Sequence, residues 1–367
     1  MTIESTQAEI SAVKAPPERG ETAADHARRL LRFLARRREA ISPLLILTHD
    51  YPDPDALAAA FALAHLVEQC YGIQAKIAYG GIVGRTENRA MVRILRIPVH
   101  KLRPSDLQKY RHVALVDTQP RFENNSFPGS RRATLVIDQH ASVRRPSAGL
   151  ALIDTECGAT CVIVAQALLQ KEIQIPVRIA TALAYGIISD TLDLYRARRP
   201  DVVQTYLSIL PRADMKMLAR IQNPSHSRKF FLTLGKAIRN AIVNRGLILS
   251  HLGPIIENPD LVSQMAEFLL TYELAKWSVC SGRYRGRLYV SLRTSQAYAQ
   301  AGEILRDVFA DRKEAGGHGA IGGGSFRVAK EPLEEDWVRA EQDIQFRLFK
   351  RLRRPTKGPF ASPFSFG

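Results

Sequence analysis

The sequence predicts an α/β protein: a mostly parallel β-sheet domain followed by a smaller α/β domain, with a cleft between them. Short apolar runs typical of buried strands alternate with helix-like segments along much of the chain. The alternation weakens past the middle of the chain and then restarts, which indicates a second domain. The length of 367 residues also favours two domains.

Changes in composition divide the chain into five parts. Proline-containing polar segments mark the expected leader and linker, because they bury little apolar surface and interrupt periodic structure. The expected parts are a disordered leader at 1–23, a first domain at 24–200 that begins with a basic amphipathic helix, a linker at 201–228, a second domain at 229–350 and a loose tail at 351–367.

The individual elements follow from the period of the apolar residues. In the first domain we expect a helix at 24–39, a strand at 44–48, a helix at 56–65, strands at 75–79, 112–116, 133–137 and 152–153, and helices at 158–171 and 176–189. In the second domain we expect a strand at 246–252, a helix at 260–274, a hairpin through 277–279 and 288–291 that turns near 285–286, a helix at 297–310, a glycine-rich loop at 316–324 and a basic helix from about 333.

Composition narrows the functional classes. The net charge of +16 favours polyanionic partners such as nucleotides or RNA. No apolar run approaches the roughly 20 residues that span a bilayer, and no signal peptide is recognisable, so we expect a cytoplasmic protein. The four cysteines suggest no disulfide framework. Cys157 and Cys161 could be a metal pair, but packing at a helix start is the simpler interpretation.

Two basic clusters lie near the ends of the chain, within 28–38 and 347–354. Each is interpreted either as the solvated face of a terminal helix or as a surface that recruits RNA or an anionic membrane. The sequence leaves both interpretations open, and it also leaves open whether the protein is a homodimer.

The segment with the clearest chemistry follows the first expected strand. His49, Asp53 and Asp55 come between the apolar run 44–48 and the next helix. In open α/β sheets, ligands bind at the carboxyl ends of the strands, so these side chains should face a binding site. One imidazole and two carboxylates suit Mn²⁺. Asp55 alone could cap the helix, but capping does not explain His49 and Asp53.

Acidic residues end further apolar segments in the same way. Asp117 follows the expected strand 112–116, Asp138–Gln139–His140 follows 133–137, and Asp190 ends an apolar helix. Because parallel strands end at one edge of a sheet, we expect these side chains to converge there. Crowded carboxylates repel one another and need cations, and a two-metal site is the simplest arrangement.

The ordered set of motifs resembles the DHH phosphoesterase superfamily, in particular its RecJ-like and nano-RNase members with pAp phosphatase activity. The matching pattern is His-x-x-x-Asp-x-Asp, a strand-terminal Asp, Asp-x-His and Ser-Asp-Thr, and Gly158–Ala159–Thr160 before a helix also resembles the family. The second half resembles the DHHA1 domain in Arg293 and in the glycine cluster around His318. The resemblance covers about residues 42–330 and implies a DHH domain followed by a DHHA1 domain.

The resemblance also implies roles for individual residues. It implies two Mn²⁺ ions, with Asp117 as the bridging ligand and with catalytic roles for Asp117 and His140. The implied metal ligands are His49, Asp53, Asp55, Asp117, Gln139 and Asp190. The implied clamp for a distal phosphate or nucleotide consists of Arg293, Gly316, Gly317, His318 and Gly319.

One position departs from the family pattern. Gln139 stands where the family has the middle histidine of Asp-His-His, which holds the second metal. An amide oxygen is a weaker ligand than imidazole for Mn²⁺. We therefore expect a weakened second metal site, with an altered metal preference or a loss of activity as the other outcomes.

The function expected from the motifs is metal-dependent hydrolysis of short oligonucleotides, as in a nano-RNase, or of pAp-like nucleotides, by two-metal activation of water. A phosphodiesterase for cyclic or linear dinucleotides is the alternative within the same class. Because of Gln139, a non-catalytic nucleotide-binding or RNA-binding protein is the alternative from another class.

Overall fold

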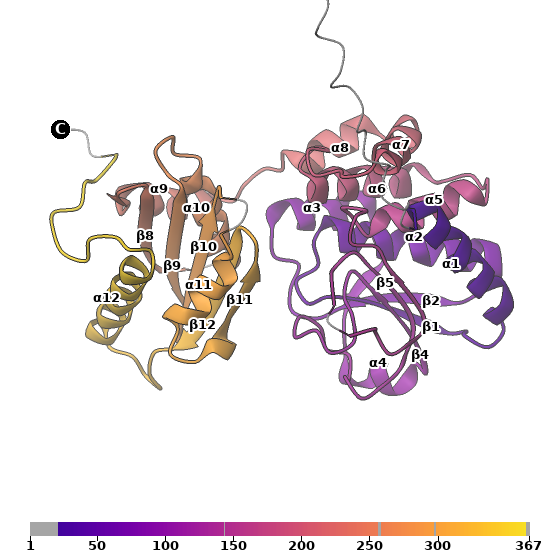
Figure 1. Ribbon diagram of the computed structural model, residues 1–367, viewed down its shortest axis with the longest axis horizontal. Coiled ribbons are helices and arrows are strands. Elements are labelled where there is room, and N and C mark those ends of the chain that lie inside the picture. Colours follow the sequence, from indigo (N-terminus) through magenta and orange to yellow (C-terminus); the bar gives the residue numbers. More distant parts are fainter. Residues whose placement is uncertain (1–20, 143, 256–257, 297–298, 365–367) are drawn as a thin grey trace, which may run out of the picture. The chain divides into compact units, whose positions relative to one another are not determined.

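A computed structural model of the protein describes residues 21–142, 144–255, 258–296 and 299–364, with the side chain of His318 not described. Almost all of the expected leader therefore lies outside the described residues. The described chain forms two compact units, one of residues 21–83 and 87–223 and the other of residues 84–86 and 224–364 (Figure 1).

The first unit is built on a six-stranded, fully parallel sheet, as the sequence predicts. Its strands are β1 (Leu44–Thr48), β2 (Ala75–Tyr79), β3 (Val99–Lys101), β4 (His112–Val116), β5 (Ala133–Asp138) and β6 (Ala148–Ile153). They are arranged in the order β3-β2-β1-β4-β5-β6. The chain therefore runs outward in one direction from β1 and then in the other from β4, which makes the gap between β1 and β4 the topological switch point.

The helices of the first unit and its two apolar layers hold this sheet in place. The helices are α1 (Ala23–Arg37), α2 (Pro54–Tyr71), α3 (Thr86–Leu95), α4 (Pro104–Lys109), α5 (Cys161–Gln170), α6 (Val177–Thr191), α7 (Pro200–Ile209) and α8 (Met215–Gln222), with a 3-10 turn η1 (Leu210–Arg212). Alternate residues of β1 face opposite cores: Leu44 and Ile46 pack with α2 and α5, whereas Leu45 and Leu47 pack with residues such as Phe127. Burial on both faces explains the uninterrupted apolar run of β1.

Several elements of the first unit were not expected from the sequence. These are α3, β3 and α4, and β6 extends over Ala148–Ile153 instead of only its last two residues. The interval 201–228 is also largely helical instead of an open linker. Pro200 occupies the first turn of α7 and Asp214 caps α8 through bonds to backbone N–H groups. Proline and aspartate start helices as readily as they break them, so the pattern there was ambiguous.

The second unit contains a six-stranded mixed sheet in the order β11-β12-β10-β9-β8-β7. Its elements are α9 (Arg228–Arg239), β7 (Ile242–Asn244), β8 (Leu247–Pro254), α10 (Asp260–Leu270), β9 (Trp277–Tyr284), β10 (Arg287–Thr294), α11 (Ala301–Val308), η2 (Arg312–Glu314), β11 (Ala315–His318), β12 (Ile321–Arg327) and α12 (Glu334–Arg351). One apolar layer joins the sheet to α9 and α10, and another joins it to α11 and α12. The expected hairpin is β9–β10, and Arg285 and Gly286 both have positive φ at its turn.

The glycine cluster forms a β-hairpin, which corrects our expectation of a loop. β11 pairs with β12 from Ala315↔Gly324 to His318↔Ile321. A Cβ at Gly322 would lie 2.7 Å from the carbonyl oxygen of Ala301, and one at Gly302 would lie 2.2 Å from that of Gly317. Glycine is therefore required here because α11 packs directly onto the hairpin backbone.

Two smaller expectations concern the membrane and the cysteines. Within the described part of the chain, no helix is both long and apolar enough to cross a membrane. All four cysteines are free thiols. Cys157 and Cys161 are fully buried in the core of the first unit, in agreement with the packing interpretation.

Candidate metal centre

The centre lies at the carboxyl edge of the parallel sheet, at its switch point. β1 and β4 are neighbours in register, with Thr48 opposite Val116. His49 directly follows β1 and Asp117 directly follows β4, so the two side chains meet where the strand order reverses. This is the position at which open α/β sheets bind ligands.

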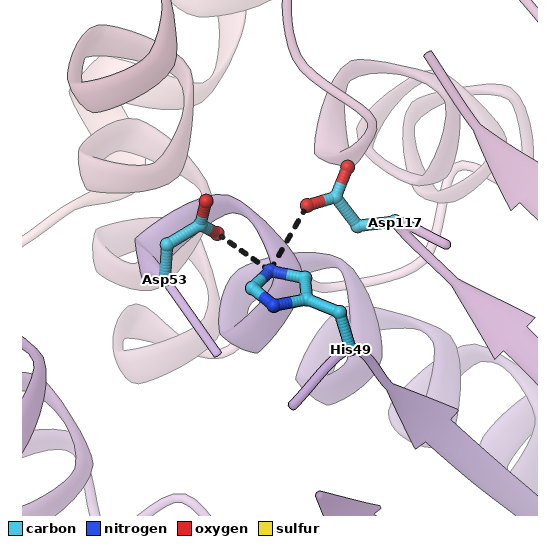
Figure 2. Close-up of side chains that lie close together, drawn as sticks. All are labelled: His49, Asp53 and Asp117. Carbon is cyan, nitrogen blue, oxygen red and sulfur yellow. Dashed lines mark ion pairs between the residues drawn. The ribbon is translucent and has the colours of Figure 1, made fainter. Parts of the chain in front are cut away.

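His49, Asp53 and Asp117 form the best-defined group (Figure 2). His49 Nε2 lies 3.5 Å from Asp117 Oδ2 and 3.8 Å from Asp53 Oδ1. On the other side of the ring, His49 Nδ1 lies 2.8 Å from the carbonyl oxygen of Asp50. A proton on Nδ1 that is donated to this carbonyl leaves Nε2 directed at the two carboxylates, as in histidines that bind metals.

The two aspartates of the first motif cap two different helices. Asp53 is the N-cap of α2 and accepts a hydrogen bond of 2.9 Å from Ala56 N. Asp55, to which we had allowed that role, is fully buried and instead accepts bonds from Thr160 N at 2.6 Å and Cys161 N at 2.8 Å, at the start of α5. The partial positive charge of a helix N-terminus favours a carboxylate there.

Asp117 is held in an uncommon backbone conformation. Its φ is 57°, its N–H donates to the carbonyl of Ile137 at 2.9 Å, and its side chain is almost fully buried. Thr160 Oγ1 donates to Asp117 Oδ1 at 2.7 Å. Residues held in the left-handed region cluster at functional sites because their surroundings must enforce the conformation. The sequence pattern Gly-Ala-Thr was the only signal for Thr160, and its contact with Asp117 was not foreseen.

Asp117 also belongs to a second group, with Asp138 and His140. His140 Nδ1 lies 2.8 Å from Asp138 Oδ1 and 3.7 Å from Asp117 Oδ1. Gln119 Nε2 donates to Asp138 Oδ2 at 2.7 Å and to the carbonyl of His140 at 2.8 Å. The sequence placed Asp138 at this edge without giving it a ligand or catalytic role, and it gave no role to Gln119.

Gln139 occupies the position between the carboxylates expected to hold the second metal. Its Nε2 donates to Asp190 Oδ2 at 2.6 Å and lies 3.4 Å from Asp55 Oδ2. The amide N–H group therefore bridges Asp55 and Asp190 where an imidazole would offer a lone pair to a cation. The expected residues converge, but at this point the structure supplies a donor instead of a ligand.

The electrostatics of the group favour the entry of cations. Burial and repulsion by Asp117 and Asp190 raise the pKa of Asp55 well above its ordinary value, and burial and repulsion by Asp53 and Asp117 do the same for Asp190. The pKa of Asp53 is lowered: burial opposes its ionisation, but the hydrogen bond and charge of His49 outweigh burial. Carboxylates that repel one another around a histidine fit a divalent cation, which would stabilise their ionised forms.

The predicted clamp residues lie in the second unit. Arg293 is buried, and its Nε donates to Glu267 Oε1 at 3.1 Å while Nη1 donates to the carbonyl of Gly322 at 3.0 Å. Gly316 and Gly317 belong to β11, and Gly319 has φ of 50° in the turn that follows. The backbone of His318 ends β11, while its side chain lies outside the described residues.

Together, the fold and the site define a parallel α/β domain with a buried carboxylate–histidine centre suited to divalent cations. Residues 43–187 match the family described as "DHH family, N-terminal domain", which identifies the first unit as a DHH-family domain. This match runs from β1 into α6 and contains the residues of the first motif, Asp117 and the Asp138–His140 segment, whereas Asp190 lies just beyond it.

Similar proteins extend the comparison beyond this domain. An uncharacterized protein of Methanocaldococcus jannaschii is 34% identical over 281 residues, which is 76% of this chain and 57% of that protein. The chain thus spans little more than half the length of the curated relative that it matches.

Among solved structures, an exopolyphosphatase-related protein from Bacteroides fragilis matches with a TM-score of 0.66 at 15% identity, covering 89% of this chain and 97% of the other. This likeness shows a shared fold. A pGpG-specific phosphodiesterase from Vibrio cholerae matches with a TM-score of 0.40 at 13% identity, covering 86% of this chain and 100% of the other.

Proposed function

We propose that the protein is a metal-dependent phosphoesterase that hydrolyses short oligoribonucleotides, pAp-like nucleotides or both. One observation carries the proposal. His49, Asp53 and Asp117 meet at the switch point of a parallel sheet. The carboxylates of Asp55 and Asp190 lie close enough for charge repulsion with this group. The DHH family, which residues 43–187 match, is a family of phosphoesterases, and this supports the same reaction type.

The residues divide into a strong and a weak candidate metal site. His49, Asp53 and Asp117 would hold the first ion, and Asp55, Asp117 and Asp190 would hold a second after the Gln139 amide moves or turns its oxygen inward. We propose Mn²⁺, because it accepts this mixture of imidazole and carboxylate ligands. When bound, such ions polarise a phosphoryl oxygen and lower the pKa of a coordinated water.

The proton for the leaving oxygen is assigned to His140. Burial opposes its charge, but the hydrogen bond to Asp138 and the charge of Asp117 raise the pKa of His140 to about 9 in the metal-free protein. His140 is therefore a cation at neutral pH, able to donate a proton or a charged hydrogen bond to a phosphate oxygen. Gln119 acts as a positioning residue, since it holds both Asp138 and the His140 backbone.

Recognition of the distal phosphate is assigned to the proposed DHHA1 domain. Arg293 offers a planar guanidinium, and the backbone N–H groups of Gly316, Gly317 and Gly319 can approach a phosphate closely, with His318 beside them. In the structure the guanidinium of Arg293 binds Glu267. A substrate phosphate would have to compete with that carboxylate, which favours dianionic terminal phosphates over a single diester charge.

A second candidate function rests on Gln139. Because its amide donates to Asp190, it occupies the second cation position without adding a negative or lone-pair ligand there. If one bound ion is insufficient for turnover, the protein would bind nucleotides without hydrolysing them.

The test is a hydrolysis assay with the full chain. The substrates are pAp, ribonucleotide dimers to pentamers, cyclic and linear dinucleotides and pyrophosphate, each with Mn²⁺, Co²⁺, Mg²⁺ or EDTA. We expect Mn²⁺-dependent release of mononucleotides or phosphate, and a decrease in kcat of about 10³-fold, or about 4 kcal/mol, in Asp117→Asn. Asp343→Asn, on exposed α12, is the matched control and should retain full activity.

Each outcome decides between the candidates. Hydrolysis of cyclic or linear dinucleotides, without hydrolysis of pAp or of longer ribonucleotides, would select the dinucleotide phosphodiesterase alternative. Binding of nucleotide with no turnover under any metal would favour the non-catalytic protein. Turnover that survives both EDTA and Asp117→Asn would refute a metal-dependent reaction at this centre.

A further inference from the structure

A basic cavity lies in the first unit, at the amino edge of the parallel sheet. Its volume is about 600 Å³, within the range of small-molecule sites. One wall is helix α1 and the other is formed by the starts of β4, β5 and β6. Six arginines line it: Arg29, Arg32, Arg36, Arg37, Arg111 and Arg132.

The sequence of α1 places its arginines on this wall. Leu30 and Leu34 are fully buried in the core of the unit, whereas Arg32 and Arg36 are exposed one turn apart. Residues four apart lie on the same face of a helix, so the two guanidinium groups project together. Phe33 lies between them in sequence and closes the cavity against Gly149, where a Cβ would be 3.7 Å from its ring.

The positive charge of the cavity is largely uncompensated. No acidic side chain lines it, and five of the six arginines form no ion pair with any described residue: Arg32, Arg36, Arg37, Arg111 and Arg132. Arg29 forms an ion pair with Glu21, which is not one of the residues that line the cavity. The five unpaired guanidinium groups around one cavity repel one another, and an anion bound among them would relieve that repulsion.

Two observations distinguish the charge of this cavity from that of the second basic cluster of the chain. In the basic cluster at 347–354, Arg347 pairs with Asp343 and Arg351 pairs with Asp307, so part of its charge is compensated. In the cavity, by contrast, the field acts on a neighbouring group: burial and the charges of Arg111, Arg131 and Arg37 lower the pKa of His112. The cavity is thus a local concentration of positive potential and not a general property of the arginine-rich helices.

We propose that this cavity binds a small molecule carrying two or more phosphate groups. Arginine grips phosphate through paired N–H groups, and arginines on two facing walls can hold two phosphates at once. Each phosphate monoester carries a charge of about −1.5 to −2, so two of them offset most of the charge of the five unpaired guanidinium groups. The lining arginines come from α1 and from the residues just before β4 and β5, so the cavity offers a compact cluster of contacts and not the extended row that a single-stranded nucleic acid needs.

The cavity is distinct from the metal centre. His112 begins β4 at the cavity, whereas Asp117 follows the opposite end of the same strand. Five residues of strand separate them by about 16 Å, at roughly 3.3 Å a residue. A ligand in the cavity therefore does not touch the candidate catalytic residues, and the inference stands whether or not the proposed function is correct.

The test measures binding of inorganic tripolyphosphate and of ATP to the full chain by calorimetry, in EDTA and 0.15 M salt. We expect Arg32→Gln/Arg36→Gln to weaken binding at least tenfold, about 1.4 kcal/mol. The matched control Arg28→Gln/Arg38→Gln removes two charges from the same helix outside the cavity and should change the affinity less than twofold. Arg111→Gln, on the other wall, gives an independent variant if the helix variant is unstable.

Three results would overturn the proposal. The first is no binding of either probe by the natural sequence. The second is an equal loss of probe affinity in Arg32→Gln/Arg36→Gln and in Arg28→Gln/Arg38→Gln, which would indicate that the probes bind to any positive surface of the helix. If a 12-nucleotide RNA also bound more tightly than the probes, and lost affinity equally in both variants, the surface would be a nucleic-acid site. The third is loss of probe binding in Asp117→Asn, which would place the probe in the metal centre, while retained binding supports a separate cavity.

Discussion

Replacing Gln139 with histidine tests whether one side chain weakens the second cation position. In the natural sequence, Gln139 Nε2 donates to Asp190 at 2.6 Å, and a cation must break this bond before it can use that carboxylate. Hydrogen bonds to charged groups contribute about 1.5–3 kcal/mol. An imidazole would remove that competitor and add a ligand, so we expect the affinity for the second ion to rise about tenfold to hundredfold, or about 1.4–2.8 kcal/mol.

The assay counts and titrates the bound ions. Calorimetry with Mn²⁺ should show one tight ion in the natural protein and two in Gln139→His, and metal analysis after dialysis should give the same ratio. Turnover at limiting Mn²⁺ should rise in parallel, because a two-metal site stabilises both the attacking and the leaving oxygen.

A matched variant separates loss of the amide from gain of a ligand. Gln139→Leu removes the amide without adding a donor atom for the metal, so it should gain less affinity than Gln139→His. If Gln139→His binds the same number of ions, with the same affinity, as the natural protein, the amide does not limit the second site and the reasoning is refuted.

The remaining predictions concern stability, and each is checked by thermal or urea unfolding. Arg199→Ala should lower the free energy of unfolding by about 3–5 kcal/mol, because it strips buried Asp154 of its bidentate partner; a loss below 1 kcal/mol would contradict this. Burial lowers the pKa of His251 in the folded protein, so the unfolded chain binds a proton at this residue more readily. The free energy of unfolding should therefore fall as the pH drops below about 6.5, and His251→Gln should make that fall smaller. Gly302→Ala would place a Cβ 2.2 Å from the Gly317 oxygen, and should cost about 1–3 kcal/mol and, under the proposed function, raise KM; unchanged unfolding would show that α11 shifts freely.

The sequence located the first sheet and its metal-facing edge well. The strand before His49 is β1 with unchanged limits, and the strand before Asp117 is β4. Buried parallel strands carry a local signal, a short apolar run that ends in polar residues, and the carboxyl ends of parallel strands share one edge. Convergence of distant acids could therefore be inferred without coordinates.

The sequence was less informative where two local interpretations coexist. Proline and aspartate in the interval 201–228 started helices instead of a linker, and the glycines after residue 315 paired as strands because α11 packs onto them. Short elements such as β3 and α4 carry too few residues for a periodic signal. Such segments acquire their structure from what packs against them.

By itself the sequence determined the parallel α/β domain and the edge at which His49 and Asp117 meet, because these follow from periodicity and residue chemistry. The departure at Gln139 followed from comparing the sequence with the motif of the family that it resembles. Only the tertiary structure decided that the Gln139 amide donates to Asp190, that Thr160 supports Asp117, and that arginines from α1 and from strand starts enclose one cavity. These relations join residues far apart in the chain. Their geometry depends on how helices dock onto the sheet, and no local pattern encodes it.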